Sequence, residues 1–358
     1  MKFVHTADMH FDTQFDTLSN SGNLSEIRRF EQRKIMKKII DYCIENNVEL
    51  LLISGDLYEH KFIRKSSIVY INELFKKIPN TKIFISPGNH DPYLKNSFYN
   101  NFDWNSNVYI FKDEIEKISI DDNTNIYGYG FSDFYCHNSN IEQIKLDETN
   151  KTNILIIHGS LDANNDDYKE YNSISSKALK DIGFDYVALG HIHKRYDNEN
   201  KKSRIVYPGS PISMGFDELG EHGMIVGDIQ KGNTEIEFIK LDEREYKEIE
   251  IDVTNMESQE EIIEKINLTP VTEDLYKIIL TGYRKNEINT KTILRLVENT
   301  NIIKVKDKTK ISYDIEEILK NNDIKGIFVK RMIERYKNHE LNEEELEKAI
   351  ELGLEALK

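Results

Sequence analysis

The chain has 358 residues, of which 39% are hydrophobic and 31% charged, and its formal net charge is −15. This composition is typical of a globular protein with a sizeable core and room for about two domains. Its two cysteines exclude a disulfide framework and favour a reducing, cytoplasmic setting, and no apolar run approaches the roughly 20 residues that cross a membrane. The acidity alone argues against nucleic-acid binding, although bound divalent cations would offset it locally.

The first 243 residues alternate between strand-like and helix-like segments. Helices are expected over 27–46 and 66–77, where apolar residues recur at three- and four-residue spacings. Strands are expected at the start of the chain and in VELLLISGD, TKIFISPGNHD, NVYIF, EKISI, NIYGYG, TNILIIHGS, FDYVALGHIH, SRIVYPGS and the paired runs of 223–241. Crossover helices mixed with near-consecutive strands predict a layered α/β or α+β sandwich.

The character of the sequence changes at about residue 244. Residues 244–312 read strand, helix, strand, helix, strand, which predicts a second, small α/β domain. Residues 313–358 read as helices, with Asn342 and Glu345 placed as a capping box. Two apolar stripes mark these helices, and each suits either a partner helix or packing within the domain: Phe328, Met332, Ile333 and Tyr336, then Leu346, Ala349, Ile350, Leu354 and Leu357.

Five short polar segments follow β-rich runs, where α/β folds place their sites. They are Asp8-Met9-His10, Gly55-Asp56, Gly88-Asn89-His90-Asp91, His158 and Gly190-His191-Ile192-His193. Residues at i and i+2 of an extended chain point to one side, so Asp8 and His10 can reach one ion together. His191 and His193 can do the same, or a bend can direct them to two neighbouring ions.

The residue types in these segments indicate a two-metal site. Asp56 can bridge two cations, and Asn89 adds a neutral oxygen to the carboxylates and imidazoles. Such a mixed set without thiolates suits Mn²⁺, Fe or Zn²⁺ and supports in-line displacement at phosphorus. His90 is placed to protonate or hydrogen-bond the leaving oxygen, and Asp91 is expected to orient it.

These segments, in this order, resemble the calcineurin-like metallophosphoesterases. Within that superfamily the chain is similar to the SbcD-type DNA repair exonucleases, on the evidence of FVHTADMHFD, GDLYEH, GNHDPY and GHIHKRY…YPGSPISMGFDELGEHG. The resemblance covers residues 1–240 well and residues 245–310 only in layout. It implies a two-sheet sandwich flanked by helices over 1–243, a capping domain over 244–312, and C-terminal helices over 313–358 that bind an ATPase.

The resemblance also implies ligand sets and an activity. The first ion, Mn²⁺ in the first instance, would take Asp8, His10, Asp56 and His193, and the second would take Asp56, Asn89, His158 and His191. The family hydrolyses DNA as an exonuclease, in some cases also as an endonuclease, works with an SMC-like ATPase of the SbcC type, and forms homodimers. One departure is Glu59, which stands where archaeal members carry a histidine.

Basic residues follow two of the motifs, namely Lys61, Arg64, Lys65, Lys194 and Arg195. They are candidates for contacts to the DNA backbone, and the alternative is ordinary solvated surface charge.

Two other functions compete with the exonuclease. The same metal site would serve a phosphodiesterase for small or cyclic nucleotides, although the cap and terminal helices count against it. The third hypothesis is a scaffold that tethers the ATPase to DNA ends.

Overall fold

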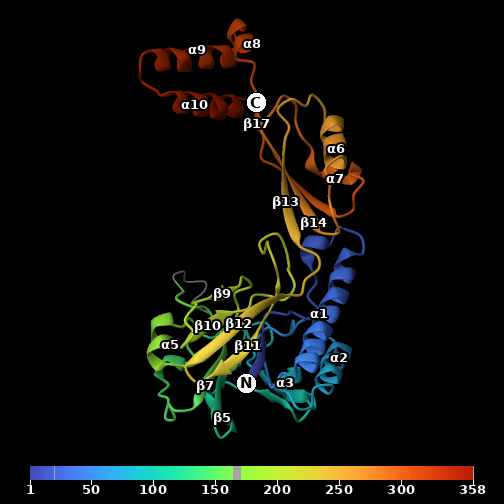
Figure 1. Ribbon diagram of the computed structural model, residues 1–358. Helices are drawn as coiled ribbons and strands as arrows, with labels where there is room; N and C mark the ends of the chain where they lie inside the picture. The colour runs from blue at the N-terminus through green and yellow to red at the C-terminus, as the bar shows by residue number, and fades with distance from the viewer. Residues whose placement is uncertain (20, 164–170, 358) are drawn as a thin grey trace. The chain divides into compact units, whose positions relative to one another are not determined.

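The computed structural model describes residues 1–19, 21–163 and 171–357. The chain divides into two compact units, Met1–Tyr246 and Lys247–Lys358, and Figure 1 shows the elements of each. The first unit ends close to the boundary expected from the sequence at residue 243. The further division of the second unit into a capping domain and terminal helices stays a prediction.

The first unit contains two six-stranded sheets. One has the order β12-β11-β1-β2-β3-β4, with β1 at Lys2–Thr6, β2 at Leu50–Ile53, β3 at Lys82–Ile85, β4 at Val108–Ile110, β11 at Gly223–Gln230 and β12 at Asn233–Lys240. The other has the order β5-β6-β7-β8-β10-β9, with β5 at Glu116–Asp121, β6 at Thr124–Tyr129, β7 at Thr152–His158, β8 at Tyr186–Gly190, β9 at Tyr196–Asp197 and β10 at Arg204–Tyr207.

The two sheets share a core because their central strands are apolar on both sides. Leu50 and Leu52 of β2 belong to the same buried cluster as Ile154 and Ile156 of β7. Their neighbours along the strands point the opposite way, and Leu155 and Ile157 belong to a second buried cluster with Leu179. The α/β fold with two sheets, predicted from the sequence, is confirmed.

The helices of the first unit are α1 (Leu24–Asn46), α2 (Lys65–Phe75), α3 (Phe98–Asn101) and α5 (Ser176–Ile182), with 3-10 turns at Asp16–Leu18 and Ile141–Gln143. The helix α1 begins three residues before the expected Ile27 and ends where Asn47 adopts a left-handed φ of 52°. It lies beside α2 (Figure 1).

Parallel pairing sets the place of the polar segments. Strand β1 pairs with β2 and β2 with β3, all parallel, so their carboxyl ends lie along one edge. Strand β7 pairs in parallel with β8, and His158 lies opposite Gly190. The carboxyl ends of these strands and the loops that follow them carry the five polar segments, so the topology brings residues from positions 8 to 193 together.

The second unit has a three-stranded sheet, β13-β14-β16, and a two-stranded one, β15-β17. The elements are β13 (Tyr246–Asp252), α6 (Gln259–Asn267), β14 (Leu275–Thr281), β15 (Tyr283–Arg284), α7 (Thr290–Leu296), β16 (Ile302–Asp307), β17 (Lys310–Ile311), α8 (Ile315–Lys320), α9 (Ile324–Lys337) and α10 (Glu343–Ala356). The expected capping box of Asn342 and Glu345 is present.

The helices α9 and α10 contact each other. A Cβ atom at Gly353 would lie 2.1 Å from the ring of Phe328, so Phe328 of the first stripe packs against α10. At this residue the first stripe therefore packs within the unit. Within the described residues, no helix is long and apolar enough to cross a membrane.

Candidate metal centre

The polar loops at the sheet edges have strained backbones. Asp8, His10 and Asp56 adopt left-handed φ values of 54°, 49° and 51°, and His191 has a φ of 106°. Such conformations cost non-glycine residues about 1–3 kcal/mol each and cluster at functional sites. Hydrogen bonds hold these loops, because the Asp8 amide donates to the Gly55 carbonyl at 3.0 Å and the His10 amide to the Asp56 carbonyl at 2.9 Å.

Two glycines of the motifs are required by close contacts in the site. A Cβ atom at Gly55, whose φ is 88°, would lie 2.4 Å from Nδ1 of His158. One at Gly88 would lie 2.3 Å from Oδ1 of Asp56. The glycines therefore allow the loops to approach the site closely.

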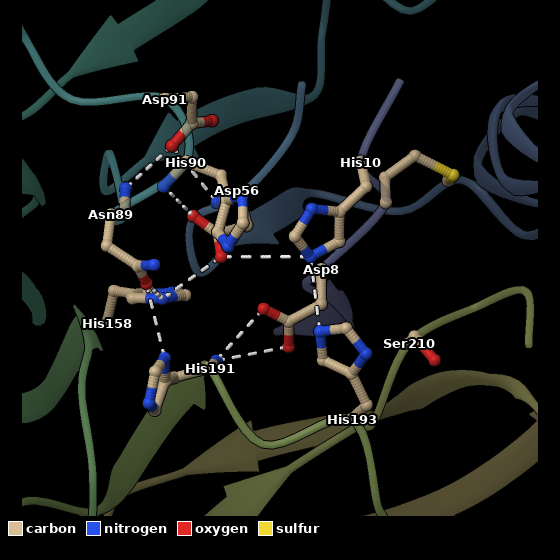
Figure 2. Close-up of polar contacts among 12 residues, drawn as sticks. Asp8, His10, Asp56, Asn89, His90, Asp91, His158, His191, His193 and Ser210 are labelled. Carbon is tan, nitrogen blue, oxygen red and sulfur yellow. Dashed lines mark hydrogen bonds and ion pairs between the residues drawn. The ribbon is translucent and has the colours of Figure 1, made fainter. Parts of the chain in front are cut away.

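The structure brings all seven expected ligands together, as Figure 2 shows: Asp8, His10, Asp56, Asn89, His158, His191 and His193. Oδ2 of Asp56 lies 3.7 Å from Nε2 of His10 and 3.4 Å from Nε2 of His158. Asp56 therefore lies between two groups, one with His10 and His193 and one with Asn89, His158 and His191, and Asp8 lies within reach of both. The two ligand sets implied by the resemblance, and the ions assigned to them, stay a prediction.

Hydrogen bonds fix the tautomers of three imidazoles. Nδ1 of His10 donates to Oε1 of Glu59 at 2.7 Å, and Nδ1 of His193 donates to Oε1 of Glu218 at 2.5 Å. Nδ1 of His158 donates to the Ser54 carbonyl at 2.9 Å. Because these oxygens only accept, each Nδ1 carries the proton and each neutral ring has its lone pair on Nε2. This is the arrangement of metal-binding histidines.

The geometry between His10 and His193 fits a cation. Their Nε2 atoms lie 3.1 Å apart. Burial lowers the pKa of His193, but its hydrogen bond to Glu218 and the nearby carboxylates raise it to about 9, so without a metal a proton on its Nε2 can bridge this gap, and a bound cation would replace that proton. Two nitrogens that bind one ion at about 2.0–2.1 Å with a right-angled arrangement lie about 3 Å apart. The donor set of imidazoles, carboxylates and an amide oxygen thus suits a pair of divalent metal ions.

The pKa values show a strongly negative potential in the site. Burial lowers the pKa of His158, but the charge of Asp56, the hydrogen bond to it and the charge of Asp8 raise it to about 9. Burial raises the pKa of Asp56, yet the nearby imidazoles, His158 first, hold it well below its usual range. The carboxylates thus favour positive charge, which divalent cations would supply while displacing protons from the imidazoles.

His90 lies at the rim of the site, with 44% of its side chain exposed. Its Nδ1 donates to Oε2 of Glu59 at 3.0 Å, so Glu59 accepts from His90 and His10 at once. Burial lowers the pKa of His90, but the Glu59 bond and the charges of Asp56, Glu59 and Asp91 raise it to about 9. The carboxylate of Glu59 thus connects the rings of His10 and His90. The ring of His90 also lies near enough to Asp56 and His10 to serve as a metal ligand.

Asp91 has a different place from the one expected. Its carboxylate is buried and accepts from the amides of Asp56, Leu57 and Gly88 at 3.1, 2.6 and 2.7 Å. The Tyr99 hydroxyl donates to it at 2.6 Å. These bonds support the backbone of the ligand loops, whereas the ring of His90 bonds to Glu59. The expected role of Asp91 in orienting His90 is therefore corrected to one of holding the loops.

The five basic residues expected to contact DNA are all at least partly exposed, namely Lys61, Arg64, Lys65, Lys194 and Arg195. Nζ of Lys61 lies 5.4 Å from the centroid of the Phe62 ring, and Cζ of Arg195 lies 4.5 Å from that of Phe238. A role in binding DNA stays a prediction for each of them.

Residues 1–195 match the model of the calcineurin-like phosphoesterase family, more than half of the 358 residues, and the chain belongs to this family. It is therefore a metal-dependent hydrolase of phosphoester bonds.

Two curated relatives are similar over most of the chain. A Bacillus subtilis protein, "Uncharacterized metallophosphoesterase YhaO", is 23% identical over 277 residues, which cover 75% of this chain and 67% of that protein. The SbcD component of the SbcCD nuclease of Staphylococcus epidermidis is 28% identical over 254 residues, which cover 62% of this chain and 64% of that protein. The chain thus spans about two thirds of the length of each relative.

Among solved structures, the crystal structure of TT1561 of Thermus thermophilus matches with 9% identity and a TM-score of 0.40, covering 67% of this chain and 98% of that one. A likeness at this level supports no conclusion about function.

Proposed function

We propose that this protein is a Mn²⁺-dependent DNA nuclease that acts as an exonuclease and, on suitable substrates, as an endonuclease. The observation that carries the proposal is the position of Asp56 between two groups of ligands, with a protonatable His90 beside it at the exposed rim. Similarity to a component of a nuclease favours DNA as the substrate.

The ligand sets would be those expected from the sequence, with Asp8, His10, Asp56 and His193 for one ion and Asp56, Asn89, His158 and His191 for the other. When bound, two such ions polarise a phosphoryl oxygen and activate water. His90, whose pKa is raised by its hydrogen bond to Glu59 and by the charges of Asp56, Glu59 and Asp91, would donate its proton or a hydrogen bond to the leaving oxygen. Glu59 accepts a hydrogen bond from Nδ1 of His90 and so orients the His90 ring.

The remaining parts of the proposal concern partners. Lys61, Arg64, Lys65, Lys194 and Arg195 would contact the phosphate backbone, which keeps DNA at the site despite the net charge of −15. The helices of 313–358 would bind an SbcC-like SMC-type ATPase, with 244–312 as the capping domain. The protein would act in DNA repair in the cytoplasm as a homodimer.

The purified 358-residue chain with Mn²⁺ would test the activity on end-labelled linear DNA and, in parallel, on bis-p-nitrophenyl phosphate. Wild type is expected to degrade DNA from its ends, and Asp56→Ala and His90→Ala are expected to fail. His137→Ala, which changes an exposed histidine outside the site, serves as the matched control and is expected to match wild type.

If the protein cleaves the small diester but not DNA, even when an ATPase partner is present, the nuclease proposal is refuted. The phosphodiesterase for small or cyclic nucleotides would then be supported. A cellular repair role that survives His90→Ala would support the tethering scaffold.

A further inference from the structure

The segment 208–222, between β10 and β11, lies directly against the metal ligand His193. The Ser210 amide donates to the His193 carbonyl at 3.1 Å. Gly209 has a φ of 78°, and a Cβ atom there would lie 2.6 Å from the same carbonyl oxygen. The backbone of the segment therefore approaches His193 as closely as a glycine allows. The proposed mechanism gives this segment no role.

Within the segment, hydrogen bonds fix both the side-chain carboxylate and the main-chain carbonyl of Glu218. Its Oε1 accepts from Nδ1 of His193 at 2.5 Å, and its Oε2 accepts from the Ser210 hydroxyl at 3.2 Å and the Met214 amide at 2.9 Å. Its main-chain carbonyl accepts from Nε2 of His222 at 2.8 Å. Only 12% of the Glu218 side chain is exposed. A carboxylate held by this many donors has a defined orientation, unlike a surface carboxylate that meets a histidine by chance.

A buried ion pair anchors the segment to the rest of the unit. Arg28 of α1, which is fully buried, donates to Asp242 at 3.0 and 2.7 Å and to the Ser213 carbonyl at 2.9 Å. Asp242 in turn accepts from the Ser213 amide at 2.9 Å. Because the Ser213 hydroxyl donates to the Glu218 carbonyl at 3.0 Å, the anchor reaches Glu218 through one residue.

We infer that Glu218 is a positioning residue for His193 and strengthens the binding of the ion held with His10. This inference rests on the proposed two-metal centre. Both imidazoles of that site donate Nδ1–H to carboxylates. A carboxylate partner fixes the ring and makes its free nitrogen a stronger donor to the ion.

The test is a Mn²⁺ titration of the metal-stripped 358-residue chain, with free Mn²⁺ followed by electron paramagnetic resonance. Wild type is expected to bind two ions. In Glu218→Gln the affinity for one ion is expected to fall about 10- to 100-fold, while the other ion keeps its affinity. Glu221→Gln is the matched control, because the Glu221 side chain is 63% exposed and its titration is expected to match wild type.

The melting temperature of each metal-stripped variant separates a positioning role from a loss of fold. Should Glu218→Gln melt well below wild type, Ser210→Ala removes one donor to the same carboxylate and is expected to weaken the binding of one ion to a smaller degree. Two ions bound by wild type and by the stably folded variant with the same affinities would overturn the inference alone. A wild type that binds no pair of ions would overturn the proposed metal centre, and the inference with it.

Discussion

Replacing Glu59 by glutamine is expected to lower kcat for phosphodiester cleavage about 10- to 100-fold at saturating Mn²⁺. One carboxylate accepts from Nδ1 of His10 at 2.7 Å and from Nδ1 of His90 at 3.0 Å. The two rings bond to different oxygens of Glu59, Oε1 and Oε2, so glutamine would place its NH₂ group, a donor, against one of the two Nδ1–H groups. A hydrogen bond to a charged group contributes about 1.5–3 kcal/mol. Because His90 is 44% exposed, solvent screening places the effect near the lower end, about 10-fold.

The pH dependence of kcat provides the sharper assay. Burial lowers the pKa of His90, while Glu59, through its hydrogen bond, is the first contribution that raises it to about 9. Removal of Glu59 therefore lowers this pKa, and His90 loses its proton at a lower pH. If His90 is the general acid, the alkaline limb of kcat moves to lower pH in Glu59→Gln.

The measurement is kcat and KM for bis-p-nitrophenyl phosphate from about pH 6 to pH 10, with metal content checked in each sample. In a His90→Ala background, Glu59→Gln is expected to add little, because the two residues act as a unit. A Glu59→Gln enzyme with kcat within about twofold of wild type and an unmoved alkaline limb would refute the reasoning.

Three further changes test the surroundings of the site and the second unit. Arg28→Met leaves Asp242 buried without its partner and is expected to lower the free energy of unfolding by about 3–5 kcal/mol in urea titrations; a loss below about 1 kcal/mol would contradict this. Gly88→Ala is expected to remove bound Mn²⁺, measured by mass spectrometry, because its Cβ would meet a ligand carboxylate at 2.3 Å; full metal content would argue against it. Gly353→Leu is expected to separate α9 from α10 at Phe328 and speed proteolysis of 313–357 without changing diester cleavage, whereas unchanged proteolysis would count against the packing.

Much of the fold was predictable because the central strands are apolar runs of strand length. Leu50–Ile53 and Thr152–His158 are buried along their whole length, as the continuous hydrophobic sequence indicates. The two-residue strands Tyr196–Asp197 and Lys310–Ile311 and the four-residue helix Phe98–Asn101 were not predicted. Their backbones are placed by tertiary contacts, and so few residues carry no periodic signal.

The expected ligands were visible in the sequence because they follow strands in short fixed patterns, while their supporting residues were not. Glu59 is 49 residues from His10, and Glu218 is 25 residues from His193. No local spacing connects such pairs, since folding alone brings them together. In the sequence, Glu59 stands out only as a departure from the histidine of archaeal members, and Glu218 only as part of the YPGSPISMGFDELGEHG stretch.

Asp91 shows how sequence adjacency can mislead. It follows His90 directly, which favoured a contact between the two side chains, but neighbours in a tight loop point in different directions. Asp91 faces inward to the amides of Asp56, Leu57 and Gly88, and burial, followed by the charge of Asp56, raises its pKa to about 6. The role of each acidic residue here therefore depends on the donors around it: amides make Asp91 a support for loops, and imidazoles make Glu59 a partner of His10 and His90.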